Sequence, residues 1–191
     1  MKNISRITAI TLAVAAGTVS LACNGCSSAG PQDSSPASTP SKLSLSSSSF
    51  EPGASIPVVY TCKGKDISPP LQWSEPPQGT KSLALIMDDP DAAGWTHWVV
   101  FNLPADVRGL EEAIAKKIEQ FAGAQNGSNS WNRQGYGGPC PPFGEHRYVF
   151  RIYALDKLLS APSGASKKDV LGLMSGHILA TGELMGKFAK K

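Results

Sequence analysis

Residues 82–104 read SLALIMDDPDAAGWTHWVVFNLP, two strongly apolar segments separated by a polar turn. The segments 82–87 and 96–103 are rich in Leu, Ile, Val, Phe and Trp, and each has the length of a strand. Proline, glycine and aspartate between them interrupt regular secondary structure. This stretch therefore predicts two β-strands.

Similar segments outside this stretch extend the β prediction to the whole domain. Further strands are expected at 56–61, 71–73 and 148–155. Helical signals are few: residues 109–118 are weakly amphipathic, and Ser166 to Asp169 resembles a capping box that begins a helix over 170–174. The apolar residues of 177–188 fit either the helical or the strand period. Residues 126–133 are expected to form a long surface loop. The pattern predicts a mainly β sandwich with small peripheral helices.

The composition fits a globular protein. The chain has 191 residues, of which 41% are hydrophobic and 17% are charged, with 19 Gly and 15 Pro. These values exclude a collagen, a coiled coil and a wholly disordered chain. The formal net charge of +3 is too small to indicate a nucleic-acid partner.

The N-terminus has the pattern of an export signal. Lys2 and Arg6 come before an apolar run over 7–22. This run is shorter than the about 20 residues that a membrane-spanning helix needs, so it is typical of a secretory signal. The residues Ser20-Leu21-Ala22-Cys23 resemble a bacterial lipobox, in which Cys23 is acylated. Residues 1–22 are therefore predicted to be a lipoprotein-type signal peptide. Ordinary cleavage before Cys23, giving a soluble periplasmic or secreted protein, is the alternative.

A polar segment separates this signal from the domain. Residues 23–42 are rich in Ser and Pro and are predicted to be a disordered tether, because they cannot bury enough apolar surface to become ordered. The folded domain is expected over 43–191, a length typical of one domain. The protein is thus expected in the cell envelope, anchored to a membrane by lipid.

Two cysteines belong to the domain. Cys62 and Cys140 could form a disulfide in an oxidising compartment, or remain as two small buried thiols. The domain contains no Cys-x-x-Cys or His-x-x-x-His spacing, so no metal site is expected.

Polar residues gather at three strand ends. The first group is Asp88-Asp89-Pro90-Asp91, whose carboxylates need donors, a cation or water, and which could equally be a simple Asx-type turn. The second is His97. The third is the glycine- and proline-rich segment 135–142, followed by His146 and Tyr148, which alternate onto one face. Such a rigid loop with hydrogen-bonding side chains suits a small anion such as phosphate.

These motifs together resemble a known family, the phosphatidylethanolamine-binding proteins, over about residues 43–188. Residues 60–62, 66–70 and 153–156 resemble its bacterial branch, the Raf-kinase-inhibitor-like proteins (YbhB/YbcL type). The segments that carry the resemblance are Asp89-Pro90-Asp91, 97–104, 135–142, His146-Arg147-Tyr148, 60–62, 66–70 and 153–156.

The resemblance implies two antiparallel sheets and a surface pocket for phosphate or a phosphorylated lipid headgroup. Carried over to this sequence, it implies that Asp89 and Asp91 flank the pocket and that His97 and His146 supply imidazole donors. The remaining ligand-binding candidates are Pro90, Gly138, Cys140, Pro141, Pro142 and Tyr148.

Three functions compete at this stage. The leading one is a non-catalytic binding protein that needs no cofactor and takes a phosphate-bearing small molecule or headgroup. The second is a modulator or inhibitor of a kinase or hydrolase, with an unidentified protein target. The third is a hydrolase that uses His97 or His146 with Asp89 or Asp91, although no Gly-x-Ser-x-Gly nucleophile motif is present.

Overall fold

The computed structural model describes residues 40–190. The predicted signal peptide, Cys23 and most of the predicted tether lie outside the described residues. The domain begins earlier than expected, because Ser41–Lys42 forms strand β1, which pairs in parallel with β9 (Ile178–Ala189). Within residues 40–190, no helix is both long and apolar enough to cross a membrane.

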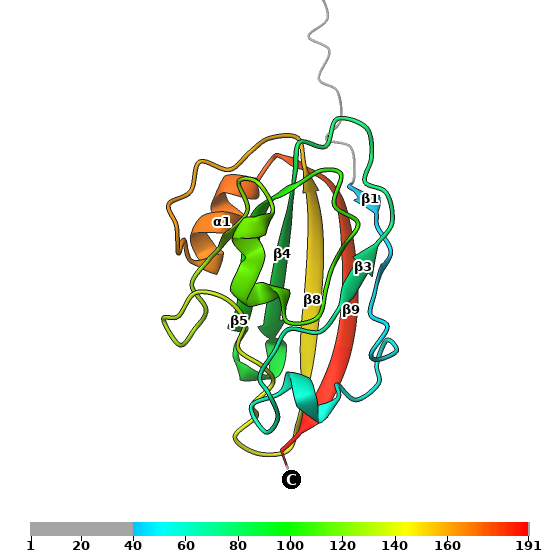
Figure 1. Cartoon of the computed structure of the whole chain (residues 1–191), viewed down its shortest axis with the longest axis vertical. Coiled ribbons are helices and arrows are strands. Elements are labelled where there is room, and N and C mark those ends of the chain that lie inside the picture. The colour runs from blue at the N-terminus through cyan, green and yellow to red at the C-terminus, as the bar shows by residue number, and fades with distance from the viewer. Residues whose placement is uncertain (1–39, 191) are drawn as a thin grey trace, which may run out of the picture. The chain divides into compact units, whose positions relative to one another are not determined.

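Two sheets of unequal size make up the domain (Figure 1). The large sheet has the strand order β1-β9-β8-β4-β5-β7, and the small sheet has the order β2-β3-β6. All pairings except β1 with β9 are antiparallel. The expected mainly β, two-sheet fold is therefore confirmed. The strands not yet given are β2 (Leu45–Ser46), β3 (Leu71–Trp73), β4 (Ser82–Asp89), β5 (Trp95–Pro104), β6 (Gly109–Leu110), β7 (Gln125–Asn126) and β8 (Glu145–Leu155).

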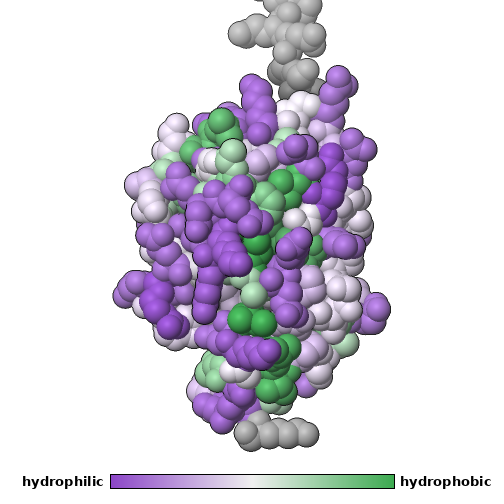
Figure 2. Space-filling view, viewed as in Figure 1, coloured by the Kyte–Doolittle hydropathy of each residue, from purple (hydrophilic) through white to green (hydrophobic). Residues whose placement is uncertain are grey.

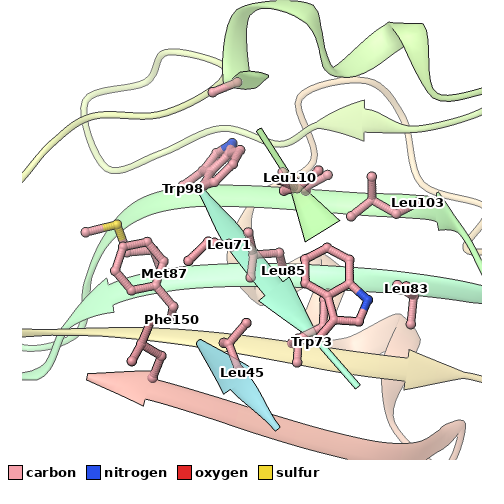
Figure 3. Close-up of a cluster of buried hydrophobic side chains, with 14 of the residues drawn as sticks. Leu45, Leu71, Trp73, Leu83, Leu85, Met87, Trp98, Leu103, Leu110 and Phe150 are labelled. Atoms are coloured by element: carbon pink, nitrogen blue, oxygen red, sulfur yellow. The ribbon is translucent and has the colours of Figure 1, made fainter. Parts of the chain in front are cut away.

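The central strands are buried on both faces. Every residue of β4 is buried, and successive side chains alternate between two clusters because a strand presents opposite faces in turn. Leu83, Leu85 and Met87 join the cluster that includes the small sheet (Figure 3). Ala84 and Ile86 join the cluster that includes helix α1. This double burial explains why 82–87 reads as a continuous apolar run instead of an alternating one.

Helix α1 (Lys167–Met174) begins as the sequence predicted. The Ser166 side chain accepts a hydrogen bond from the Asp169 backbone amide, and the Asp169 side chain accepts one from the Ser166 amide, completing a capping box. Val170 and Met174 bury the inner face of the helix against the large sheet. In the ambiguous segment 177–188, residues 178–188 belong to β9 and His177 directly precedes it.

Two local predictions are wrong. Residues 56–61 form no strand but contain a 3₁₀ turn, η1 (Val58–Tyr60), which follows Pro57. Residues 109–118 form β6 and then a kinked 3₁₀ segment, η3 (Ile114–Gln120), instead of a helix. In both cases single residues such as Ile56, Tyr60 and Ile114 enter the core while Val58 stays exposed, so the apolar spacing reflects no regular element. The predicted loop 126–133 is largely confirmed, except that Asn126 ends β7.

Gly186 in β9 is a position where another part of the chain comes close. A Cβ there would lie 2.5 Å from Cγ1 of Ile56, whereas a Cβ on Gly172 in α1 would meet nothing within 4 Å. We predict that Gly186→Ala destabilises the domain by about 1–3 kcal/mol through overpacking. The matched change Gly172→Ala should instead stabilise it by up to about 1 kcal/mol. Chemical denaturation measures both, and a Gly186→Ala variant as stable as wild type would contradict the close packing.

Candidate ligand-binding site

The Asp89 carboxylate, at the end of β4, is central to the site. Its Oδ1 accepts hydrogen bonds from the backbone amides of Asp91 (2.9 Å) and Ala92 (3.1 Å), and so caps the 3₁₀ turn η2 (Pro90–Ala92). Its Oδ2 accepts a hydrogen bond of 2.7 Å from Nδ1 of His146. The sequence left open whether these aspartates form a turn or a candidate site. Asp89 caps a turn and also pairs with a candidate site residue, so the two interpretations are compatible.

The pair of His146 and Asp89 is recessed. The two side chains are only 9% and 4% exposed. Because Nδ1 of His146 is bonded to the carboxylate, Nε2 is the ring atom left to meet a ligand. That atom accepts a hydrogen bond in the neutral ring and donates one in the imidazolium form.

His97, on β5, is held differently. Its Nδ1 donates a hydrogen bond of 2.7 Å to the carbonyl oxygen of Gly137, and its ring meets Trp131 and Tyr148 edge-on at centroid distances of 5.0 and 5.1 Å. Burial lowers the pKa of His97, which favours the neutral ring. In the neutral ring the one N–H is therefore already bonded within the protein, and the expectation that His97 donates to a ligand stays a prediction.

Tyr148 carries unused hydrogen-bonding capacity. The side chain is fully buried in β8 and meets the His97 ring edge-on. Its hydroxyl makes no hydrogen bond of normal geometry among residues 40–190, although the Asp89 carboxylate and the Cys140 backbone lie near it. Gln125 Oε1 is the other such buried atom in that part of the chain. Burial and the nearby Asp89 carboxylate raise the pKa of Tyr148, so the phenol keeps its proton. It is thus a donor next to the Asp89–His146 pair.

Asp91 and Arg147 lie at the rim of the site. The Arg147 guanidinium and backbone amide bind the Asp91 carboxylate, with a shortest distance of 2.6 Å between Nη2 and Oδ1. These hydrogen bonds lower the pKa of Asp91 to about 2. Asp91 is held in this ion pair, and the expectation that it flanks a ligand pocket stays a prediction.

The loop over 135–142 is fastened at several points. Cys140 forms a disulfide with Cys62, with a Cα–Cα distance of 5.4 Å, which decides between the two states that the sequence left open. The Gly138 amide donates a 2.6 Å hydrogen bond to Asp66 Oδ1, and a Cβ on Gly138 would lie 2.3 Å from the Tyr60 carbonyl oxygen. Only glycine fits there. In the same loop Pro141 is buried and Pro142 is exposed.

Two aromatic residues of the site were missed by sequence reasoning. Trp131, in the predicted surface loop, meets the His97 ring edge-on and also meets Trp95 at a centroid distance of 5.5 Å. Phe143 is 76% exposed and lies 6.2 Å from the His146 ring. The available signal was a single aromatic residue within an otherwise polar or Gly/Pro-rich segment.

We call the cluster of Asp89, His97, His146 and Tyr148, whose side chains are all buried, the recess. Cavities of about 420 to 670 Å³ occur elsewhere on the domain, and none of these is lined by Asp89, His97, His146 or Tyr148. Over the described range 40–190, no group of three or more His, Cys, Asp and Glu side chains is placed to hold a metal ion. The residues present are suited to a small hydrogen-bonding group.

Comparison with known proteins assigns the family. The sequence profile of the family "Phosphatidylethanolamine-binding protein" matches residues 46–189. The chain belongs to this family. A UPF0098 protein of Methanothermobacter thermautotrophicus is 49% identical over 150 residues, covering 78% of this chain and 99% of the relative. The resemblance seen in the sequence is thus confirmed.

Two solved structures of the phosphatidylethanolamine-binding protein family have the same fold. The homologue CT736 of Chlamydia trachomatis is 43% identical with a TM-score of 0.72, and the match covers 78% of this chain and 99% of that one. Escherichia coli YbcL, described as a member of the mammalian PEBP family, is 31% identical with a TM-score of 0.73, over 79% of this chain and 100% of its own. Since those chains consist of little besides this domain, residues 40–191 are expected to fold alone.

The disulfide provides a test of how the loop is held. Removing a native disulfide from a small domain costs about 2–5 kcal/mol. We predict that dithiothreitol lowers the melting temperature of the wild type, and that the double variant Cys62→Ser/Cys140→Ser melts at the reduced value with or without reductant. Calorimetry measures this. Equal melting temperatures for the oxidised wild type and the double variant would show that the bridge does not stabilise the domain.

Proposed function

We propose that this member of the phosphatidylethanolamine-binding protein family binds a small phosphate-bearing ligand in the recess around Asp89 and His146, without catalysing its conversion. The observation that carries the proposal is the buried Tyr148 hydroxyl, which has no partner in the described domain. A buried donor without a partner costs about 1–3 kcal/mol, and an incoming oxygen would recover it. Nε2 of His146 supplies a second point of contact beside it.

The hydrogen-bonding groups of the recess suit an anion that accepts a hydrogen bond from one histidine and can donate one to the other. Protonation of His146 next to the Asp89 carboxylate gives a charge-assisted donor at Nε2, the kind of group that binds phosphate oxygens strongly. His97, neutral and bonded through Nδ1, offers a lone pair at Nε2 to a P–OH or to an ammonium group. Free phosphate and a phosphoethanolamine headgroup share this chemistry.

A binding role is favoured over hydrolysis by the state of the nucleophile candidates. Cys140 is held in a disulfide and offers no thiolate. His97 is oriented by the Gly137 carbonyl and not by a carboxylate, so it lacks the partner that would support its protonation during base catalysis. His146 does have such a partner in Asp89, so the preference for binding rests on His97 and on the absence of a Cys140 thiolate.

Titration calorimetry on residues 40–191 tests this proposal, with inorganic phosphate in one arm and phosphoethanolamine in the other. Tyr148→Phe and His146→Gln each remove one ligand-facing group, and we expect each to weaken binding at least tenfold, about 1.4 kcal/mol. His177→Gln is the matched control. His177 lies away from the recess, and its Nδ1 is 2.9 Å from Oδ1 of Asp156. It should bind as the wild type does.

The two arms also separate the sources of the ligand. Tighter binding of phosphoethanolamine than of phosphate would point to a headgroup, and equal binding to a free phosphate compound. Absence of saturable binding in folded wild type would refute the ligand site. A protein target, contacted through the exposed Phe143 at the rim, would then become the leading function.

We further propose that the protein is exported and anchored by lipid at Cys23, as the sequence Ser20-Leu21-Ala22-Cys23 suggests. In a bacterial host, the wild type should partition with the membrane fraction, and Cys23→Ser should abolish both this partitioning and the acylated N-terminal peptide seen by mass spectrometry. Cys26→Ser controls for loss of a nearby thiol and should stay membrane-bound. Wild-type protein found only in the soluble fraction would contradict the anchor.

A further inference from the structure

A second polar cavity, of about 590 Å³, lies beside the candidate ligand site but shares none of its four central residues. Its walls come from three separate parts of the chain, residues 65–68, 113–116 and 133–136, together with Asn126 of β7. The face of the domain that carries η3 is largely hydrophilic (Figure 2). We call this space the η3 cavity.

Three cationic side chains line the η3 cavity. Lys65 follows η1, Lys116 belongs to η3, and Arg133 lies in the loop before the glycine-rich segment. Within residues 40–190, none of the three forms an ion pair. By contrast, Arg147, Arg151 and Lys167 elsewhere on the surface are all paired.

A single acidic residue, Asp66, lines the cavity together with these cations. Its Oδ1 accepts the 2.6 Å hydrogen bond from the Gly138 amide, so part of its charge is used within the loop. The cavity therefore has an excess of positive charge. Like charges that converge on one space repel one another, and an anion placed between them removes that repulsion.

Hydrogen bonds within the protein hold the walls of the cavity in place, and the three cationic side chains take no part in them. Asn126 donates to the Ala115 carbonyl oxygen (2.8 Å) and accepts from Trp98 Nε1 (3.0 Å), while the Tyr136 hydroxyl donates to the Tyr60 carbonyl oxygen (2.8 Å). Ser68 Oγ accepts from the Ala115 amide, which leaves its hydroxyl proton available. The lining thus holds its shape. Within residues 40–190 Lys65 and Lys116 form no ion pair, and the Arg133 guanidinium lies over the Trp131 ring, 5.7 Å from its centroid, with no carboxylate paired to it.

We propose that the η3 cavity binds a small molecule carrying two or more anionic groups, such as an organic diphosphate or a tricarboxylate. The volume lies in the range of about 300–1,000 Å³ common for small-molecule sites. A guanidinium binds two oxygens of one phosphate or carboxylate, and the two ammonium groups can each neutralise a further charge. This site uses residues distinct from those of the proposed function and does not depend on it.

The test is calorimetric titration of residues 40–191 with two probes, pyrophosphate and citrate, at low ionic strength. The Tyr148→Phe variant serves as the background, so that binding in the Asp89–His146 recess is weakened. Lys116→Gln and Arg133→Gln remove lining cations, and we expect each to weaken binding of at least one probe by tenfold or more. Lys117→Gln, the next residue along η3, is exposed and does not line the cavity, and should bind as its parent does.

Each outcome decides the proposal. Saturable binding that Lys116→Gln and Arg133→Gln weaken, and that Lys117→Gln and Tyr148→Phe leave intact, would support the site. Preference for pyrophosphate or for citrate would then identify the ligand as a phosphate or a carboxylate compound. Loss of binding in Tyr148→Phe alone would place the probe in the first recess and overturn the proposal. No binding of either probe, or equal weakening by Lys117→Gln, would overturn it as well.

Discussion

The two oxygens of the Asp89 carboxylate join the end of the central hairpin to the last long hairpin of the domain. One oxygen caps the turn that follows β4, and the other holds His146 at the start of β8. This arrangement depends on the register between β4 and β8, in which Asp88 lies opposite Val149. The recess therefore exists only when the large sheet is correctly paired, and its geometry reports on the fold as a whole.

The loop over 135–142 is also held in place by contacts with distant parts of the chain. It is attached to the sheet through the bond from His97 to Gly137, to the turn after η1 through Asp66, and covalently through the Cys62–Cys140 disulfide. Glycines allow the backbone to approach these partners closely, and prolines reduce the freedom of the rest. One end of this loop consequently lines the η3 cavity through Gly135 and Tyr136, while the adjacent Gly137 carbonyl holds His97.

Sequence reasoning succeeded where a residue's role is local or where burial leaves a continuous pattern. The apolar runs of β4 and β5 and the capping box of α1 are of this kind. It failed at 56–61 and 109–118, because isolated side chains that fill gaps in the core imitate the spacing of a regular element. At the site, the candidates Asp89, His97, His146 and Tyr148 do come together, whereas Asp91 is taken by Arg147.

The amino-acid sequence by itself determined the fold class, the family and the residue types of the recess, because strand periodicity, turn residues and ordered motifs are written along the chain. Only the tertiary structure decided how those residues act. Which nitrogen of each histidine is free, which carboxylate is already paired and whether two cysteines meet all depend on partners distant in the sequence. The same holds for the η3 cavity, whose cations lie on three separate segments and converge only once the chain has folded.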